Sequence, residues 1–248
     1  MHAIALQLAL AASAAATPFA NPFPGILSAR DVINHDAVVG FPQTVPEGII
    51  GEQYLAYQPY LYVETGCVPF PAVDANGNTG GGLKPTGSPS GSCSKSTGQI
   101  YSRSTMGDGT VDTYGAAIMY AWYMPKDSPS TGLGHRHDWE GVIVWLADAA
   151  STAAENVVAV CPSGHGGWDC STDGFKLEGT HPLVWYYSDW PVNHQMGLTD
   201  VVGGTQPLIA WESLPEAARA ALENTDFGSA TPPLKDGTFG GNLEKGKY

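Results

Sequence analysis

Short β-prone segments recur along this chain and constrain its fold more than any other feature. They are rich in Val, Ile, Tyr and Trp, and Gly, Pro, Asn or Asp residues separate them. The segments are 53–62, 99–106, 114–124, 141–146, 156–160 and 182–188. Strands of this length with turn residues between them are typical of an antiparallel β-sandwich. The sequence therefore predicts a mainly β fold with peripheral helices (α+β).

Helix signals are confined to two places. Residues 217–222 are strong helix formers, preceded by Ser213 and Glu216 in a capping-box pattern with Pro215 in the first turn, and Gly228 is the expected stop. A second short helix is expected over residues 31–39. The Gly- and Pro-rich residues 229–248 are expected to wrap the surface.

The first 20 residues have an Ala- and Leu-rich apolar core followed by small residues. This composition predicts a secretory signal peptide over residues 1–20. Residues 21–30 are expected to be a pro-segment or an N-terminal arm, and residues 31–248 a single domain. No later apolar run approaches the roughly 20 residues that a membrane-spanning helix needs, so we expect a secreted, extracellular protein.

Cys67, Cys93, Cys161 and Cys170 form an even set. In a secreted protein, an even set favours two disulfides, and three pairings are formally possible. We predict pairing between neighbours, which gives Cys67–Cys93 and Cys161–Cys170. The first bridge would close a loop rich in Gly, Pro and Ser that has little packing to hold it.

The formal net charge of -13 excludes two classes of partner. An acidic protein is repelled by nucleic acid and by anionic lipid surfaces. We therefore expect no nucleic-acid ligand, and any membrane partner must be recognised through specific contacts.

Metal-capable side chains are concentrated in the segment 134–140, GHRHDWE. His135, Asp138 and Glu140 lie within six residues, and Asp127 lies just upstream in a Pro-broken loop. Three carboxylates favour calcium, magnesium or manganese, whereas zinc prefers His and Cys. The alternative is that these carboxylates are solvated loop residues and that the histidines only pack or form hydrogen bonds.

Strand alternation alone would separate these groups, because side chains i and i+1 face opposite sides. His135 and His137 would share one face, and Asp138 and Glu140 the other. A common site therefore requires a bend, which Gly132 and Gly134 make accessible. His137 could belong to the cavity or form a structural hydrogen bond.

The groups that flank this segment have simpler interpretations. We expect Arg136 to pair with a carboxylate, Trp139 to pack inside and His165 to be exposed.

A second polar cluster spans residues 189–194 and contains Trp190 and His194. Trp190 would either fill the core or stack on a sugar ring.

The segment 117–140, AIMYAWYMPKDSPSTGLGHRHDWE, closely resembles the hallmark region of the necrosis- and ethylene-inducing peptide-like proteins. These are secreted cytolysins of plant-associated fungi, oomycetes and bacteria. The resemblance extends to Cys67, Cys93 and the segment 190–194. It implies a β-sandwich similar to actinoporins and fungal lectins, with a calcium or magnesium ion in an acidic cavity.

By this resemblance, Asp127, His135, Asp138 and Glu140 form the cation site, two carboxylates binding directly and the others largely through water. Trp190 and His194 would recognise the terminal sugar of glycosyl inositol phosphorylceramide, a plant plasma-membrane sphingolipid. Residues 117–136 resemble a peptide that plant surface receptors perceive. Cys161 and Cys170 depart from family members with a single disulfide, which leaves the subgroup open.

Membrane damage without catalysis is the function that the resemblance implies. One alternative is a metal-dependent hydrolase with His135 or Glu140 as general base, although no nucleophile motif accompanies these residues. Another is a secreted lectin without lytic activity, in which the cation only stabilises the fold.

Overall fold

The computed structural model of the protein describes residues 30–189 and 193–248. The predicted signal peptide, most of the 21–30 segment and Trp190 lie outside the described residues. Arg30 is exposed, and its guanidinium donates a hydrogen bond to the carbonyl of Ala220 at 2.7 Å.

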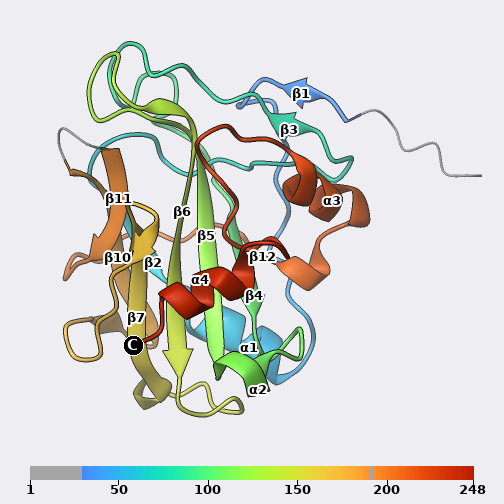
Figure 1. The fold of residues 1–248 in the computed structure, drawn as a ribbon, viewed down its shortest axis with the longest axis vertical. Coiled ribbons are helices and arrows are strands. Elements are labelled where there is room, and N and C mark those ends of the chain that lie inside the picture. The colour runs from blue at the N-terminus through green and yellow to red at the C-terminus, as the bar shows by residue number, and fades with distance from the viewer. Residues whose placement is uncertain (1–29, 190–192) are drawn as a thin grey trace, which may run out of the picture.

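Two main sheets and one small sheet form the described part of the chain (Figure 1). The larger sheet has the order β12-β4-β5-β6-β7-β8, the smaller one has the order β11-β10-β2 with β9 beside β10, and β1 pairs with β3. The strands are β1 Val32–Ile33, β2 Tyr60–Val63, β3 Thr79–Gly80, β4 Ile100–Ser104, β5 Ala117–Asp127, β6 His135–Leu146, β7 Val157–Gly164, β8 Gly167–Trp168, β9 Leu177–Glu178, β10 His181–Asp189, β11 Asn193–Leu198 and β12 Leu208–Ala210. Strand β11 packs against β6 and β7 and thereby joins the two main sheets.

The mainly β prediction is confirmed, with one correction on strand direction. The central pairs β4–β5, β5–β6, β6–β7 and β10–β11 are antiparallel, as expected. However, β2 runs parallel to β10, β12 to β4 and β1 to β3. Each parallel pair joins segments that are far apart in the chain, and a local sequence pattern carries no information on such pairings.

Helices cover the ends and one face of the larger sheet. They are α1 Ile49–Ala56, α2 Val111–Tyr114, α3 Glu216–Asn224 and α4 Phe239–Lys245, with short 3-10 turns η1 Ala154–Asn156 and η2 Trp211–Ser213. Figure 1 shows α4 crossing in front of the larger sheet, while α1 and α2 lie at the end opposite β1 and β3. No helix among the described residues is long and apolar enough to cross a membrane.

The helix predictions were right at one place and wrong at others. The helix near 217–222 is confirmed as α3, but it ends at Asn224, and Pro215 rather than a side-chain cap precedes it. Residues 31–39 contain strand β1 instead of a helix, because their backbone pairs with β3. The C-terminal tail contains α4, and the predicted strand 53–62 begins as helix α1.

Strand β5 is the centre of the core, and each of its residues is buried. The Tyr120 hydroxyl donates to the carbonyl of Tyr54 in α1 at 2.9 Å, and the Tyr123 ring packs 5.8 Å from Phe227, which follows α3. Burial of this kind explains why the strand is rich in large apolar and aromatic side chains. The end of β5 is thus a rigid support for the Asp127 side chain.

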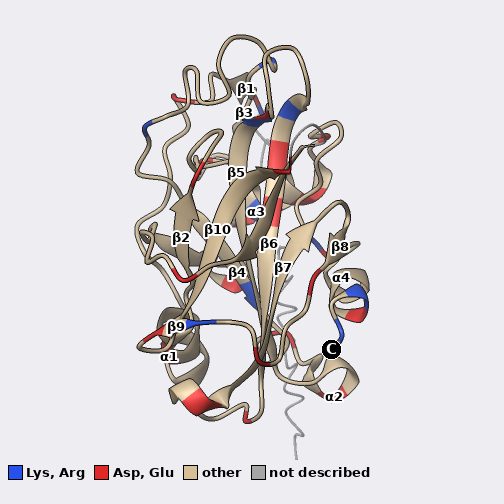
Figure 2. Cartoon of the chain, turned by 90° about the vertical axis from the view of Figure 1, so that its left-hand side faces the viewer, with Lys and Arg blue, Asp and Glu red and all other residues tan. Residues whose placement is uncertain are grey.

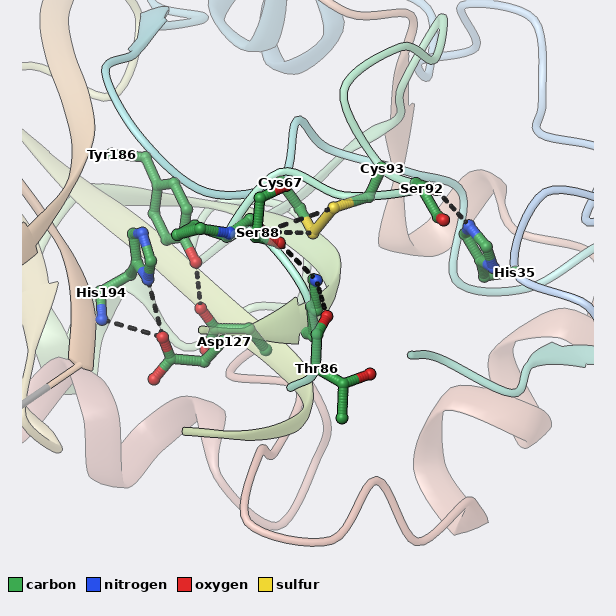
Figure 3. The surroundings of a disulfide bond; sticks show 12 residues. His35, Cys67, Thr86, Ser88, Ser92, Cys93, Asp127, Tyr186 and His194 are labelled. Atoms are coloured by element: carbon green, nitrogen blue, oxygen red, sulfur yellow. Dashed lines mark hydrogen bonds and ion pairs between the residues drawn. A yellow bond between two sulfur atoms is a disulfide. The ribbon is translucent and has the colours of Figure 1, made fainter. Parts of the chain in front are cut away.

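Both predicted disulfides are confirmed. Cys67 is bonded to Cys93 and Cys161 to Cys170, and the described part of the chain has no free cysteine. Figure 3 shows the first bridge beside the end of β5. There Lys126, buried despite its charge, donates through Nζ to the carbonyls of Thr86 and Ser88 at 3.2 and 2.9 Å. The disulfide loop is therefore fastened directly to the residue next to Asp127.

Candidate cation and ligand site

The end of β5 and the start of β6 bring the predicted site residues together. Asp127 is the last residue of β5 and faces His135, the first residue of β6, across the antiparallel pair. Asp138 and Glu140 follow on β6 and are buried. Figure 2 shows the acidic residues of β6 behind β10.

The pairing of β5 with β6 is irregular at this point. Lys126 pairs with both Arg136 and His137, although the register is the same on either side, since two residues of each strand lie between the pairs Met124–Asp138 and Asp127–His135. His137 adopts a left-handed backbone with φ of 61°. A left-handed residue interrupts the regular alternation of side chains along a strand. His135 therefore shares a cavity with Asp138 and Glu140, as the sequence analysis required.

The bend involves His137 as well as the two glycines of the preceding turn. Gly132 and Gly134 have φ of 82° and 94° and form the preceding turn. The His137 ring accepts a hydrogen bond from the Tyr123 hydroxyl at 2.7 Å and meets Phe227 edge-on at 5.3 Å. Burial, reinforced by the nearby Arg136 charge, lowers the pKa of His137 to about 4. His137 is thus a neutral, structural residue at pH 7.

Residue 194 orients Asp127 through two hydrogen bonds to the same oxygen. The backbone N–H of His194 lies 3.0 Å and its ring Nδ1 2.7 Å from Asp127 Oδ1, as Figure 3 shows. Because both donors use Oδ1, Oδ2 remains buried without a hydrogen-bond partner. An orphaned carboxylate oxygen inside a protein is costly unless a positive group or water reaches it.

The tautomer of His135 adds a second acceptor beside that oxygen. Its Nδ1 lies 2.8 Å from the carbonyl oxygen of His137, which can only accept, so Nδ1 carries the proton. In the neutral ring, Nε2 then presents a lone pair, 3.6 Å from Asp127 Oδ2. Two electron-rich atoms that face each other are stabilised by a positive species between or beside them.

Asp138 and Glu140 complete the acidic cluster. The Tyr186 hydroxyl donates to Asp138 Oδ2 at 2.6 Å, and the Ser163 hydroxyl donates to Glu140 Oε2. Burial, followed by the negative charge of Asp127, raises the pKa of Asp138 to about 7. Burial and the Asp138 charge likewise raise the pKa of Glu140 well above its usual range. The fold thus holds negative charge where water cannot fully solvate it.

A cavity of about 390 Å³ opens beside the cluster. His135, Asp138 and Glu140 line one side, and Trp168, Asn193 and Lys245 line others. The site therefore combines acceptor oxygens with an aromatic surface and one ammonium group. That combination suits a polar ligand of small size.

The donor set fits a hydrated hard cation better than a closed metal shell. Carboxylate oxygens are the ligands that calcium and magnesium prefer, and Asp127 Oδ2 is free to serve as one. Within residues 30–189 and 193–248, however, no three His, Cys, Asp or Glu side chains converge closely enough to hold an ion by themselves. Water molecules must therefore complete any coordination sphere here.

The remaining sequence predictions have mixed outcomes. Trp139 is buried and His165 is exposed, as expected. Arg136 does not pair with a carboxylate, because its guanidinium donates to the carbonyls of Gly81 and Gly82. His194 belongs to strand β11 and is only 1% exposed.

The sequence analysis missed Trp168 and Lys245, which line the cavity, Tyr186 and Ser163, which hold the carboxylates, and Gly66, which lies against the His194 ring. Alternation along the strand 182–188 could have indicated that Tyr186 faces inward. No local signal identifies Ser163 or Gly66, because their partners are distant in sequence.

Comparisons with known proteins find a matching family model and solved structures of the same fold. The model of the family Necrosis inducing protein (NPP1) matches residues 51–246. A necrosis-inducing protein NPP1 from Phytophthora nicotianae is 48% identical over 217 residues, which cover 84% of this chain and 88% of the relative. The solved structure of NLPPya in complex with mannosamine has a TM-score of 0.79 and 48% identity, over 88% of this chain and 99% of that one. The structure of the non-toxic HaNLP3 protein has a TM-score of 0.78 and 38% identity, over 85% and 97% of the two chains.

The raised pKa of Asp138 predicts how stability depends on pH in the presence of a chelator. Between pH 4 and about 7 the folded protein holds a proton on Asp138 that the unfolded chain, with its lower pKa, has lost. The contribution of this group to the free energy of unfolding therefore falls as the pH rises through that range and is constant above it. We expect Asp138→Asn to gain about 3 kcal/mol relative to wild type between pH 5 and pH 8. Urea unfolding across that range measures the difference, and a gain independent of pH would contradict the assignment.

The close approach of Gly66 to His194 predicts a second effect. A Cβ at position 66 would lie 2.6 Å from His194 Nε2 and 3.0 Å from the Tyr186 ring. We expect Gly66→Ala to displace the His194 ring and to lower the free energy of unfolding by about 1–3 kcal/mol. Gly87→Ala is the matched control, since Gly87 also has positive φ and lies in the loop that Cys67, the neighbour of Gly66, closes with Cys93, but has nothing within 4 Å of its Cβ. Urea unfolding and the NMR signals of His194 compare the two variants, and equal effects would show that backbone strain alone is responsible.

Proposed function

The chain belongs to the necrosis-inducing protein (NPP1) family, and we propose that it is a secreted cytolysin that damages plant plasma membranes after cation-dependent recognition of a sphingolipid sugar. The observation that carries the proposal is the buried acidic cluster, in which Asp127 Oδ2 has no hydrogen-bond partner. Family and relatives bear toxin and effector names rather than enzyme names, so a non-catalytic role is favoured.

A calcium or magnesium ion would bind at this cluster. Asp127 and Asp138 would supply carboxylate oxygens, Glu140 and the Nε2 of His135 would act directly or through water, and the ion would offer its positive charge to sugar hydroxyls. Tyr186 and Ser163 fix the orientations of Asp138 and Glu140 by donating hydrogen bonds. The ligand would then meet a preorganised site in a protein whose overall field is negative.

The sugar would be held in the cavity beside the cluster. The solved NLPPya structure with mannosamine supports a sugar as the ligand class, and we infer the terminal sugar of glycosyl inositol phosphorylceramide as the target. Trp190 enters this proposal from the sequence resemblance alone. His194 contributes indirectly, because its buried ring holds Asp127 instead of reaching the cavity.

Membrane damage would follow this recognition. A net charge of -13 disfavours general attraction to anionic lipid, so the local cation and the sugar contacts must direct binding. The two packed sheets with peripheral helices support the proposed similarity to actinoporins and fungal lectins, which also act on membranes or sugars.

A non-lytic sugar-binding role is the second candidate. It is supported by the 38% identical relative HaNLP3, which is described as non-toxic and has the same fold. In that case the cation site would serve recognition alone. Lysis and sugar binding must therefore be measured separately.

A further activity is proposed for residues 117–136, which would be perceived by a plant surface receptor. In the folded protein, β5 is wholly buried, so its peptide would be presented only after unfolding or proteolysis. Recognition of the peptide would depend on sequence, whereas lysis would depend on the fold.

Removing one carboxylate should abolish lysis without unfolding the protein. We expect Asp138→Asn to lower dye leakage from plant plasma-membrane vesicles at least tenfold in calcium or magnesium, because a ligand charge is lost. Chelation should do the same to the wild type. Glu47→Gln is the control, since Glu47 is an exposed acid outside the cavity.

The leakage assay also separates the two candidate functions. Full leakage by folded Asp138→Asn, or leakage unaffected by chelation, would contradict the cation role. Binding of the sphingolipid without leakage from the wild type would favour the non-lytic role.

Heat treatment should separate lysis from perception. We expect heated, reduced protein to lose vesicle leakage completely and to keep its ability to trigger ethylene production in leaves, because the exposed 117–136 sequence needs no fold. Loss of both activities in protein that stays soluble and intact would contradict receptor perception of this segment.

A further inference from the structure

The outer face of the smaller sheet carries aromatic side chains that the cation site does not use. Side chains alternate along β10, so Tyr186 points inward to Asp138 while Trp185 and Tyr187 point outward. Across the sheet, Trp185 pairs with Gly197 on one side and with Tyr62 on the other. We propose that this outer face holds a second carbohydrate site, for a neutral hexopyranose ring with equatorial hydroxyls.

The two outward rings form a braced stack. The centroids of Trp185 and Tyr187 lie 4.2 Å apart with an interplanar angle of 20°. The stack depends on Gly197, where a Cβ would lie 2.3 Å from Trp185 Nε1 and 2.9 Å from the Tyr187 ring. Gln195 holds the Tyr187 hydroxyl by a hydrogen bond. The indole is therefore fixed in place before any ligand arrives, which lowers the entropic cost of binding.

A groove of about 550 Å³ lies beside the indole, and Tyr62, Leu198 and Val201 form the rest of its apolar lining. Trp185 lines this groove, whereas Tyr187 does not. Because Tyr187 covers one face of the indole, Trp185 offers the groove its other face and edge. A flat aromatic surface contacts the C–H face of a pyranose whose hydroxyls are all equatorial.

Polar groups around the same groove match the hydroxyls of such a ring. Glu64, Lys176 and Asp200 are exposed at its rim, and none of the three takes part in an ion pair among the described residues. Carboxylates accept hydrogen bonds from hydroxyls, and the ammonium donates them. Two carboxylates against one ammonium disfavour an anionic ligand, and a net charge of -13 disfavours a second copy of this chain.

The groove is separate from the cation cavity, since the two share no lining residue. The inference therefore does not rest on the proposed cytolytic function. Binding at the groove should need no divalent ion. Cation dependence thus distinguishes the two sites in one titration.

The test is calorimetric titration of the purified protein with cellotetraose in the presence of a chelator. We expect binding that is unchanged in Asp138→Asn and at least tenfold weaker in Trp185→Ala and in Asp200→Asn. Tyr187→Phe is the matched control, because it keeps the ring that stacks on Trp185 and removes only the hydroxyl that Gln195 holds. Sorbitol, a polyol without a ring, should not bind.

Three binding results would overturn the proposal. The first is absence of cellotetraose binding by the wild type. The second is equal binding by the wild type and by folded Asp200→Asn and Trp185→Ala. The third is binding that requires calcium and is lost in Asp138→Asn. Sedimentation of the wild type as a dimer that Trp185→Ala dissociates would also overturn it, by showing that this face pairs with a second copy. Urea unfolding confirms that each variant is folded.

Discussion

The left-handed backbone of His137 is the constraint on which the site depends. In a regular strand, His135 would project from the face of β6 opposite Asp138 and Glu140, and the left-handed conformation of His137 interrupts that alternation. A non-glycine residue at positive φ is unfavourable, and here tertiary contacts compensate for it. Tyr123 hydrogen-bonds the imidazole, and Phe227 packs on its edge. The His137 carbonyl in turn receives Nδ1–H of His135 and so sets that ring's tautomer. A single backbone irregularity therefore fixes both the position and the tautomer of the neighbouring His135 ring.

Buried negative charge is the second feature of this site, and hydrogen bonds compensate for its burial only in part. Asp138 and Glu140 each receive one hydroxyl hydrogen bond, and Asp127 receives two bonds on a single oxygen. These contacts orient the carboxylates but do not neutralise them. Burial and mutual repulsion instead raise the pKa values of Asp138 and Glu140. A structural role alone would be served better by neutral side chains, since an uncompensated buried charge is destabilising. The presence of such a cluster beside a cavity is thus a physical argument for a positively charged ligand.

Sequence reasoning was successful where the signal was local and failed where partners were distant. The β-rich pattern, both disulfides and the need for a bend between His135 and Asp138 could all be predicted from short segments. The parallel pairs β2–β10 and β4–β12 could not, because each joins segments roughly a hundred residues apart or more. The same limit hid the contact of His194 with Asp127, which lies 67 residues away. The sequence analysis assigned His194 to sugar recognition, yet pairing of its strand with β10 buries it.

Strand β10 contributes aromatic side chains to both faces of the smaller sheet. Tyr186 faces inward, donates to Asp138 and stacks on the His194 ring with centroids 4.8 Å apart. Its neighbours Trp185 and Tyr187 face outward and stack on each other instead. Each face has a glycine that makes room for aromatic rings, Gly66 inside and Gly197 outside. Because backbone pairing fixes the register, a shift of one residue would exchange the two faces and destroy both. The register that builds the acidic site is therefore also the one that creates the outer aromatic groove.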